Sequence, residues 1–323
     1  MPCYHPLTRV SVPGNINLDT GKLIGTVKPY IPLEKRLPDV TYQDIPCGQC
    51  LGCRLDYSRK WADRLMMESK EHEFTWFVTL TYDDFHLPIG ARSDPATGEV
   101  LSYVPTLRKS DVQAFMKRLR KAVSPVKIRF FCSGEYGDKT FRPHYHLIVF
   151  GLPLDDLVFY KAGSAGQLYY NSDTISKAWQ EKGYCVVAPA TYETMLYTSR
   201  YVTKKLKGFE SVFYKANGIE SPFSLMSRKP GIGANSFSYD IMHYENICLP
   251  QGRRAPHPRY FQKLLERDFP DFYEVYKSDR QQRSDYRMQQ LIDSIEIPYL
   301  DYLKVQESNL KSRIKVLDEV KTL

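Results

Sequence analysis

The chain has 323 residues, enough for one large or two modest domains with a well-buried core. Its net charge of +8 is a moderate basic excess that suits a nucleic-acid partner, and its 24 tyrosines and 16 phenylalanines suit stacking on unpaired bases. No stretch approaches the ~20 apolar residues of a membrane span. The first residues also lack the pattern of a secretory signal, so we expect a protein of the reducing cytoplasm that contacts no membrane.

A cysteine cluster precedes the first predicted helix, which runs from about residue 50 to 69. The cluster has C-x2-C-x2-C spacing and consists of Cys47, Cys50 and Cys53. Thiolates at this spacing, at a turn entering a helix, can converge on one Zn2+. Structural zinc takes four ligands, so we expect Cys3 to be the fourth, with His5 as the alternative. Free thiols at a helix start and a redox role are the competing interpretations.

The middle of the chain alternates predicted strands and helices. We expect strands at 74–82, 127–136, 144–150 and 184–188, and helices at 110–123 and 171–182. The first of these helices opens with a capping box, in which Ser110 is the cap and Gln113 lies three residues on. The short turn between the second and third strands implies an antiparallel hairpin. The order β-α-β-β-α-β is the split βαβ arrangement. It predicts an α+β fold whose antiparallel sheet has helices on one face and leaves the other free for a ligand.

Two histidines lie on one face of the third strand. His144 and His146 are two residues apart, and strand side chains alternate between faces. Glu135 ends the preceding strand and can approach the same patch across the hairpin. Two imidazoles and one carboxylate can hold Mg2+ or Mn2+ and leave open positions that polarise a phosphate oxygen. The competing interpretation is a pair of ordinary histidines near a strand end.

A further helix is expected from about residue 191 to 206. Tyr197 and Tyr201 are four residues apart and share a helix face, and Lys204 lies near that face three residues further on. A tyrosine hydroxyl near a metal-bound phosphate can attack phosphorus and form a covalent ester. Lys204 can assist the developing charge or orient the nucleophile, so we favour Tyr201 as the first to attack. The alternative is an amphipathic helix whose two tyrosines are half-buried.

These motifs together resemble a known superfamily. The His144-Tyr145-His146 triplet and the Tyr197-x3-Tyr201-x2-Lys204 pattern are similar to the histidine and tyrosine motifs of HUH endonucleases. Four segments, in order along the chain, resemble the replication initiation proteins of gokushoviruses: residues 46–54, 134–137, 142–146 and 226–233. Gokushoviruses are small single-stranded-DNA phages of the microvirus family, and the resemblance extends to about residue 240.

The resemblance implies a rolling-circle replication initiator. Such a protein nicks the plus strand at the origin, joins one tyrosine to the 5′-phosphate and frees a 3′-hydroxyl that primes a host polymerase. The second tyrosine later closes the displaced strand into a circle. Implied partners are single-stranded and origin DNA, and host helicase and DNA polymerase, in the host bacterial cytoplasm. An HUH transposase or relaxase is the alternative among enzymes, and a nucleic-acid-binding protein without catalysis is the alternative outside them.

The remaining predictions concern DNA contacts and domain boundaries. The residues expected to bind DNA are Arg142, Arg200, Lys205, Arg228 and Lys229. The last two lie in a loop at 221–233 that either contacts phosphates or caps the sheet. We expect residues 1–70 to form the cysteine element and basic helix, residues 71–207 the HUH core, and residues 208–323 accessory loops and a helical C-terminal region.

Overall fold

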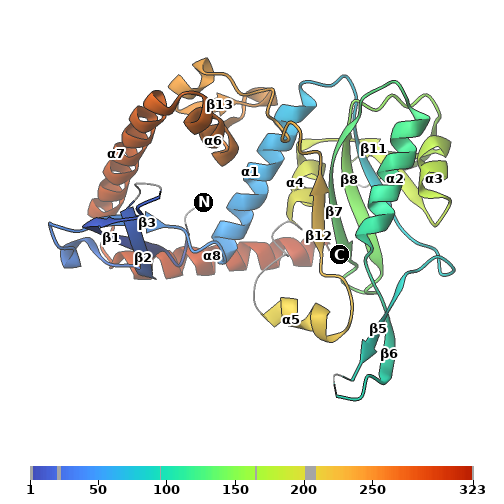
Figure 1. The fold of residues 1–323 in the computed structure, drawn as a ribbon, viewed down its shortest axis with the longest axis horizontal. Coiled ribbons are helices and arrows are strands. Elements are labelled where there is room, and N and C mark those ends of the chain that lie inside the picture. The colour runs from blue at the N-terminus through green and yellow to red at the C-terminus, as the bar shows by residue number, and fades with distance from the viewer. Residues whose placement is uncertain (1–2, 20–22, 95, 164–165, 201–208, 322–323) are drawn as a thin grey trace. The chain divides into compact units, whose positions relative to one another are not determined.

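The computed structural model describes residues 3–19, 23–94, 96–163, 166–200 and 209–321 (Figure 1). The chain divides into two compact units, one made of Met1–Tyr57 with Lys277–Leu323 and the other of Ser58–Tyr276. These units cut across the three segments expected from the sequence, whose boundaries stay a prediction. Within the described ranges, no helix combines the length and the apolar character needed to cross a membrane.

The first unit combines the two ends of the chain. Its three-stranded antiparallel sheet has the order β2-β1-β3, with β1 at Leu7–Ile16, β2 at Leu23–Pro29 and β3 at Thr41–Ile45. Its helical parts are the start of α1 (Leu51–Ser69), the end of α7 (Pro270–Ser294) and α8 (Tyr299–Lys321). One small cluster of buried side chains, Tyr4, Cys50 and Leu303, joins the N-terminal segment, α1 and α8. This apolar core is too small to stabilise the unit by burial alone.

The second unit is built on a seven-stranded sheet in which every paired strand is antiparallel. Its order is β12 (Phe223–Met226), β7 (Arg129–Tyr136), β8 (Pro143–Phe150), β4 (Thr75–Leu80), β11 (Cys185–Pro189), β10 (Leu168–Ser172) and β9 (Leu157–Ala162). The expected α+β class with an antiparallel sheet is therefore confirmed. Strands β9, β10 and β12 extend the sheet at both edges and were not predicted.

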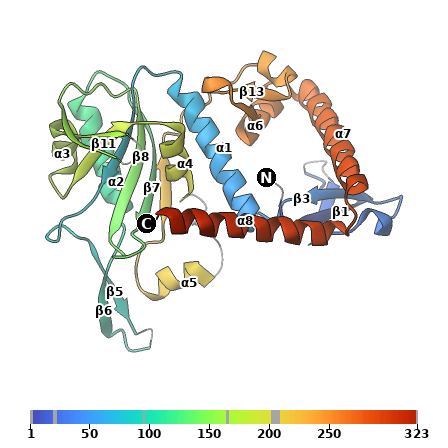
Figure 2. The same cartoon turned by 180° about the vertical axis from the view of Figure 1, so that it is seen from behind.

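Helices cover both faces of this sheet (Figures 1 and 2). On one face, α2 (Lys109–Ala122) and α3 (Asp173–Trp179) bury Phe115 and Trp179 against β4 and β8. On the other, α1 and α4 (Tyr192–Arg200) bury Leu65 and Met195 against β7 and β8. The prediction of a free second face is therefore wrong, because the apolar stripe of α1 needs a surface against which to bury.

The remaining elements lie at the margins of the second unit. They are the hairpin β5 (Ile89–Ser93) and β6 (Val100–Pro105), α5 (Phe209–Ala216), the pair β13 (Asn246–Cys248) and β14 (Arg254–Pro256), and α6 (Arg259–Asp268). The β5–β6 hairpin projects from the sheet in both views (Figures 1 and 2).

The residue between the two histidines fixes β8 to α2. Tyr145 is fully buried, and its hydroxyl accepts a hydrogen bond of 2.9 Å from the amide of Arg108 and donates one of 3.2 Å to the Arg108 carbonyl. Arg108 is the residue before α2, and no side chain caps this helix. The predicted Ser110 capping box is therefore wrong. The backbone at the helix entrance is satisfied by a strand residue instead.

Replacing Tyr145 with Phe is expected to lower the free energy of unfolding of the second unit by about 1–2 kcal/mol, because the Arg108 amide loses its acceptor and the buried hydroxyl of Tyr82 loses a partner. Urea unfolding followed by tryptophan fluorescence measures this, since all three tryptophans lie within Ser58–Tyr276. The matched control is Tyr103→Phe in the exposed hairpin, with no expected change. Equal stability of the two variants would contradict this account of the helix entrance.

Candidate functional site

Three predicted metal ligands meet on the face of the sheet that α1 and α4 partly cover. The register of the β7–β8 hairpin places Glu135 directly opposite His144. Glu135 Oε1 lies 3.1 Å from Nε2 of His144 and 2.9 Å from Nε2 of His146. The three ligand atoms all lie within 4.8 Å of one another. A carboxylate oxygen and two imidazole nitrogens at this spacing are compatible with one bound metal ion.

Neighbouring groups turn both imidazoles toward this point. Nδ1 of His144 lies 3.1 Å from the carbonyl oxygen of Arg142, which only accepts hydrogen bonds, so this nitrogen carries the proton. Nδ1 of His146 lies 3.1 Å from Oγ1 of Thr79. In the neutral ring of His144, Nε2 therefore presents a lone pair toward a carboxylate oxygen. Two acceptors at contact distance need a cation or a proton between them, so the donor set fits a divalent metal.

The protonation states suit metal binding. Burial alone raises the pKa of the Glu135 carboxyl, but the adjacent His144 and His146 more than offset it, so this pKa lies below its ordinary value. Burial lowers the pKa of His146, although Glu135 opposes the shift. At neutral pH the carboxylate is therefore ionised and the His146 ring is neutral, which are the forms that bind metals.

One predicted nucleophile lies beside this cluster. Tyr197 projects from α4, and its hydroxyl is 3.4 Å from Nε2 of His146. Its ring meets the imidazole edge-on, with centroids 4.9 Å apart, and 37% of the residue is exposed. On the sheet, Phe77 stacks on His146 at 5.4 Å and an interplanar angle of 11°. The Tyr197 hydroxyl is thus held next to a candidate ligand while its side chain stays accessible.

A buried contact positions the start of α4. The hydroxyl of Tyr192, the first residue of the helix, donates a 3.0 Å hydrogen bond to the carboxylate of Asp63 on α1. The Arg253 guanidinium lies over the Tyr192 ring at 3.9 Å. Burial and the negative charge of Asp63 raise the pKa of Tyr192, so it remains a neutral donor. The helix that carries Tyr197 is therefore anchored one turn before that residue.

Only some of the other predicted site residues lie within the part of the chain that the structure describes. Tyr201, Lys204 and Lys205 lie outside the described residues. Arg200 is the exposed last residue of α4. Arg142 holds Asp84 at 2.5 Å and donates a 2.9 Å hydrogen bond to the Tyr82 carbonyl, so it ties the start of β8 to the loop after β4.

The loop that carries Arg228 and Lys229 lies at the other end of β7 from Glu135. Strand β12 ends at Met226, which pairs with Phe131. Arg129 holds the backbone of the loop by donating a 2.8 Å hydrogen bond to the Pro230 carbonyl. The side chains of Arg228 and Lys229 in this loop are exposed. The loop caps this end of the sheet, and the structure does not bring its basic residues to the metal cluster.

Thr79 and Phe77 were not identified as site residues from the sequence. The alternation along β4 places both on one face, and that signal was available. Their pairing with His146 and Ile148 depends on β4 lying next to β8, which local patterns do not reveal.

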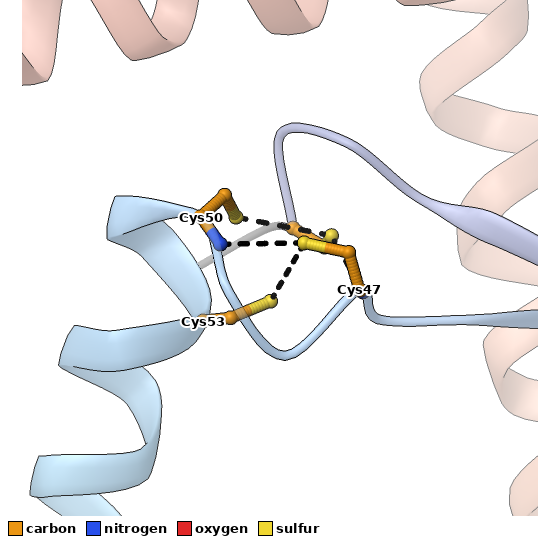
Figure 3. Close-up of side chains that lie close together, drawn as sticks. Cys47, Cys50 and Cys53 are labelled. Atoms are coloured by element: carbon orange, nitrogen blue, oxygen red, sulfur yellow. Dashed lines mark hydrogen bonds between the residues drawn. The ribbon is translucent and has the colours of Figure 1, made fainter. Parts of the chain in front are cut away.

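A second candidate metal site lies in the first unit. Figure 3 shows Cys47, Cys50 and Cys53 converging where α1 begins. Sγ of Cys47 lies 4.0 Å from Sγ of Cys53, and Sγ of Cys50 lies 3.9 Å from Sγ of Cys3. All four sulfur atoms lie within 4.8 Å of one another, near the roughly 3.8 Å that separates thiolates in a tetrahedral site with 2.3 Å Zn–S bonds. His5, the alternative fourth ligand, instead lies 3.0 Å from Glu307.

Backbone amides favour the thiolate form of Cys50, whereas burial raises the pKa values of Cys3 and Cys53. The amide of Tyr4 donates to Sγ of Cys50 at 3.4 Å, and the amide of Cys47 donates to Sγ of Cys3 at 3.2 Å. Burial raises the pKa of Cys50, but amide donors outweigh it and bring that pKa to about 7. Burial dominates at Cys3 and raises its pKa to about 11. The four sulfurs thus share one site that is compatible with a metal ion.

Comparison with known proteins identifies the family. Residues 75–206 match the sequence profile described as Replication-associated protein ORF2/G2P. The chain is 34% identical over 292 residues to Replication-associated protein ORF2 of Spiroplasma virus 4, a match that covers 86% of each protein. The chain belongs to the phage replication-associated protein family. The resemblance to gokushovirus replication proteins is thereby confirmed.

Two further relatives carry similar descriptions. This replication-associated protein is 29% identical over 241 residues to Replication-associated protein VP4 of Bdellovibrio phage phiMH2K, which covers 72% of the chain and 70% of the relative. It is 31% identical over 238 residues to Replication-associated protein ORF4 of Chlamydia phage 1, a match that covers 69% of the chain and 54% of the relative. No solved structure matches it at a comparable level of significance.

Proposed function

We propose that this replication-associated protein initiates rolling-circle replication by nicking single-stranded DNA at the origin. The observation that carries the proposal is the 3.4 Å contact between the Tyr197 hydroxyl and His146, which belongs to a cluster of two histidines and a glutamate. A tyrosine alone is a weak nucleophile, and a metal-ligand cluster alone has many uses. Their combination on one sheet face suits attack on a phosphodiester.

The topology supports an HUH core. The elements β4, α2, β7, β8, α3 and β11 follow one another along the chain, and the four strands lie in the order β11-β4-β8-β7. This order is compatible with a split βαβ unit, which supports the proposal. The histidines lie on a central strand, where pairing on both sides fixes their direction.

The proposed chemistry is a transesterification. The tyrosine oxygen attacks phosphorus and gives up its proton, the bond to the 3′-oxygen breaks, and that oxygen takes a proton to become the free 3′-hydroxyl. The 5′-phosphate stays joined to tyrosine as an ester. A divalent ion, Mg2+ or Mn2+, held by Glu135, His144 and His146 would polarise the scissile phosphate. Tyr201 is the proposed nucleophile of the first cleavage, with Lys204 as its electrostatic partner, and Tyr197 is the proposed nucleophile of the later strand closure.

The DNA strand must be unpaired or distorted to reach the sheet face that carries Glu135, His144 and His146. We propose that Arg200 and Lys205, which adjoin the tyrosines in sequence, contact the DNA backbone near the nick. Arg142, Arg228 and Lys229 are proposed as further contacts, the last two at the far end of the sheet. The expected partners are origin DNA, host helicase and host polymerase inside the infected bacterium. The Cys3, Cys47, Cys50 and Cys53 cluster is proposed to hold one structural Zn2+ in the first unit.

The proposal is tested by incubating the full chain with overlapping single-stranded segments of the plus strand of the encoding phage genome and Mn2+. We expect one segment to yield a covalent protein–DNA band on a denaturing gel. EDTA and the Glu135→Ala variant should each abolish the band, because the carboxylate is the ligand that meets both imidazoles. A chain that binds these segments but forms no covalent band with any of them would instead be a non-catalytic DNA-binding protein.

A further inference from the structure

Two buried serines lie next to the metal cluster on the same face of the sheet. Ser133 on β7 pairs directly with His146 on β8, and Ser224 on β12 pairs directly with Ser133. Side chains in such cross-strand pairs have Cβ atoms about 4.5–5.5 Å apart. Glu135 lies two residues along β7 and projects from the same face. The row Ser224, Ser133 and His146 therefore crosses three strands and ends at a candidate ligand.

The two hydroxyls have no hydrogen-bond partner among the residues that the structure describes. Ser133 is fully buried and Ser224 is 9% exposed, so bulk water does not satisfy them. An unpaired buried hydroxyl costs about 1–3 kcal/mol, and native proteins rarely keep two side by side. By contrast, Ser227, just beyond β12, accepts a 3.1 Å hydrogen bond from the amide of Phe130. A polar group is therefore needed next to Ser133 and Ser224 and not next to Ser227.

We infer that Ser133, supported by Ser224, positions a water molecule bound to the metal at Glu135, His144 and His146; this rests on the proposed metal site. Mg2+ and Mn2+ favour six oxygen or nitrogen ligands and usually keep several waters. Three protein ligands leave positions for such waters. Ser133 makes no direct hydrogen bond to Glu135 and has no exposed surface, so it can meet a small bridging molecule but not a DNA phosphate.

This assignment makes Ser133 a positioning residue with a distinct signature. Ser133→Ala removes a hydroxyl that has no partner in the metal-free protein, so the metal-free melting temperature should stay the same or rise slightly. The same variant should weaken Mn2+ binding about 10-fold, the lower end of what outer-shell substitutions cost. Ser224→Ala should also weaken Mn2+ binding, but by less than Ser133→Ala.

The experiment is calorimetric titration of the full chain with Mn2+ in the absence of DNA, alongside melting curves with and without the ion. Water-proton relaxation by bound Mn2+ supplies a second readout, because a loosened metal-bound water exchanges faster in Ser133→Ala. Ser227→Ala is the matched control. It should lower the melting temperature with and without Mn2+, since it strips the Phe130 amide of its acceptor, and leave the Mn2+ affinity unchanged.

The outcomes separate this inference from the function on which it rests. Wild-type protein that binds Mn2+ with the same affinity as Ser133→Ala overturns the inference and leaves the metal site standing. A fall in metal-free stability of Ser133→Ala also overturns it, because the hydroxyl would then have a structural partner. Wild-type protein that binds no Mn2+ overturns the proposed metal site itself.

Discussion

The double variant Tyr197→Phe/Tyr201→Phe is expected to form no covalent adduct with DNA, a loss of roughly 10³-fold or more. Phenylalanine keeps the edge-on packing of Tyr197 against Phe77 and His146 but has no oxygen to attack phosphorus. The fold and the metal cluster should therefore be retained. Labelled single-stranded plus-strand DNA and denaturing electrophoresis measure the adduct, and Mn2+ titration checks that the cluster is intact.

The single variants assign the order of attack. We expect Tyr201→Phe to lose the first cleavage and Tyr197→Phe to keep it while failing in strand closure. Tyr184→Phe is the matched control, because Tyr184 is 81% exposed and precedes a strand of the same sheet. It should behave as wild type. An adduct that persists in the double variant would rule out both tyrosines, and loss of first cleavage in Tyr197→Phe alone would reverse the order.

Loss of metal from the cysteine cluster is expected to unfold the first unit. Among its described residues, the buried apolar cluster comprises Tyr4, Cys50 and Leu303, which is far too little to offset the entropy of ordering the chain. Structural zinc supplies about 10–16 kcal/mol in small zinc-dependent peptides. We expect purified protein to contain about one zinc ion per chain and Cys50→Ser to contain none. Elemental analysis measures the metal, and hydrogen exchange at the Tyr4 amide reports the unfolding.

Cys248→Ser is the control for this experiment, because Cys248 is an exposed cysteine on β13 outside the cluster. It should retain the metal and the slow exchange of Tyr4. The tryptophan fluorescence of the second unit should change little in either variant, which separates local from global unfolding. Zinc-free wild-type protein with a protected Tyr4 amide would exclude a structural role for a metal.

Local patterns were enough to predict much of the candidate site. The two-residue spacing of His144 and His146 settles which face of β8 they share, and the short turn brings Glu135 to them, because both relations act over a few residues. What could not be predicted depends on distant pairing. Thr79 meets His146 only because β4 lies beside β8. The entrance to α2 is set by Tyr145, 37 residues beyond Arg108, so a local capping box gave the wrong start.

The prediction that one face of the sheet is free was also wrong because it depends on contacts between distant parts of the chain. Helix α1 was recognised from its apolar spacing, but nothing in that spacing says against which surface Leu65 packs. The unpredicted edge strands are short and partly exposed, and β9 lacks a polar and apolar alternation that would separate it from a loop. Periodicity therefore specified the elements and their inward faces, while the partner of each face came from the tertiary fold.

The pairing of Glu135 with His144 makes the site sensitive to strand slippage. A slip of one residue between β7 and β8 would turn Glu135 to the α2 face and leave both imidazoles without a carboxylate, because side chains alternate along each strand. The site thus exists in a single register. An ion bound there would favour that register over its neighbours by the full difference in binding energy. The metal would then select for correct assembly of the sheet, because only a hairpin paired in this register presents all three ligands to it.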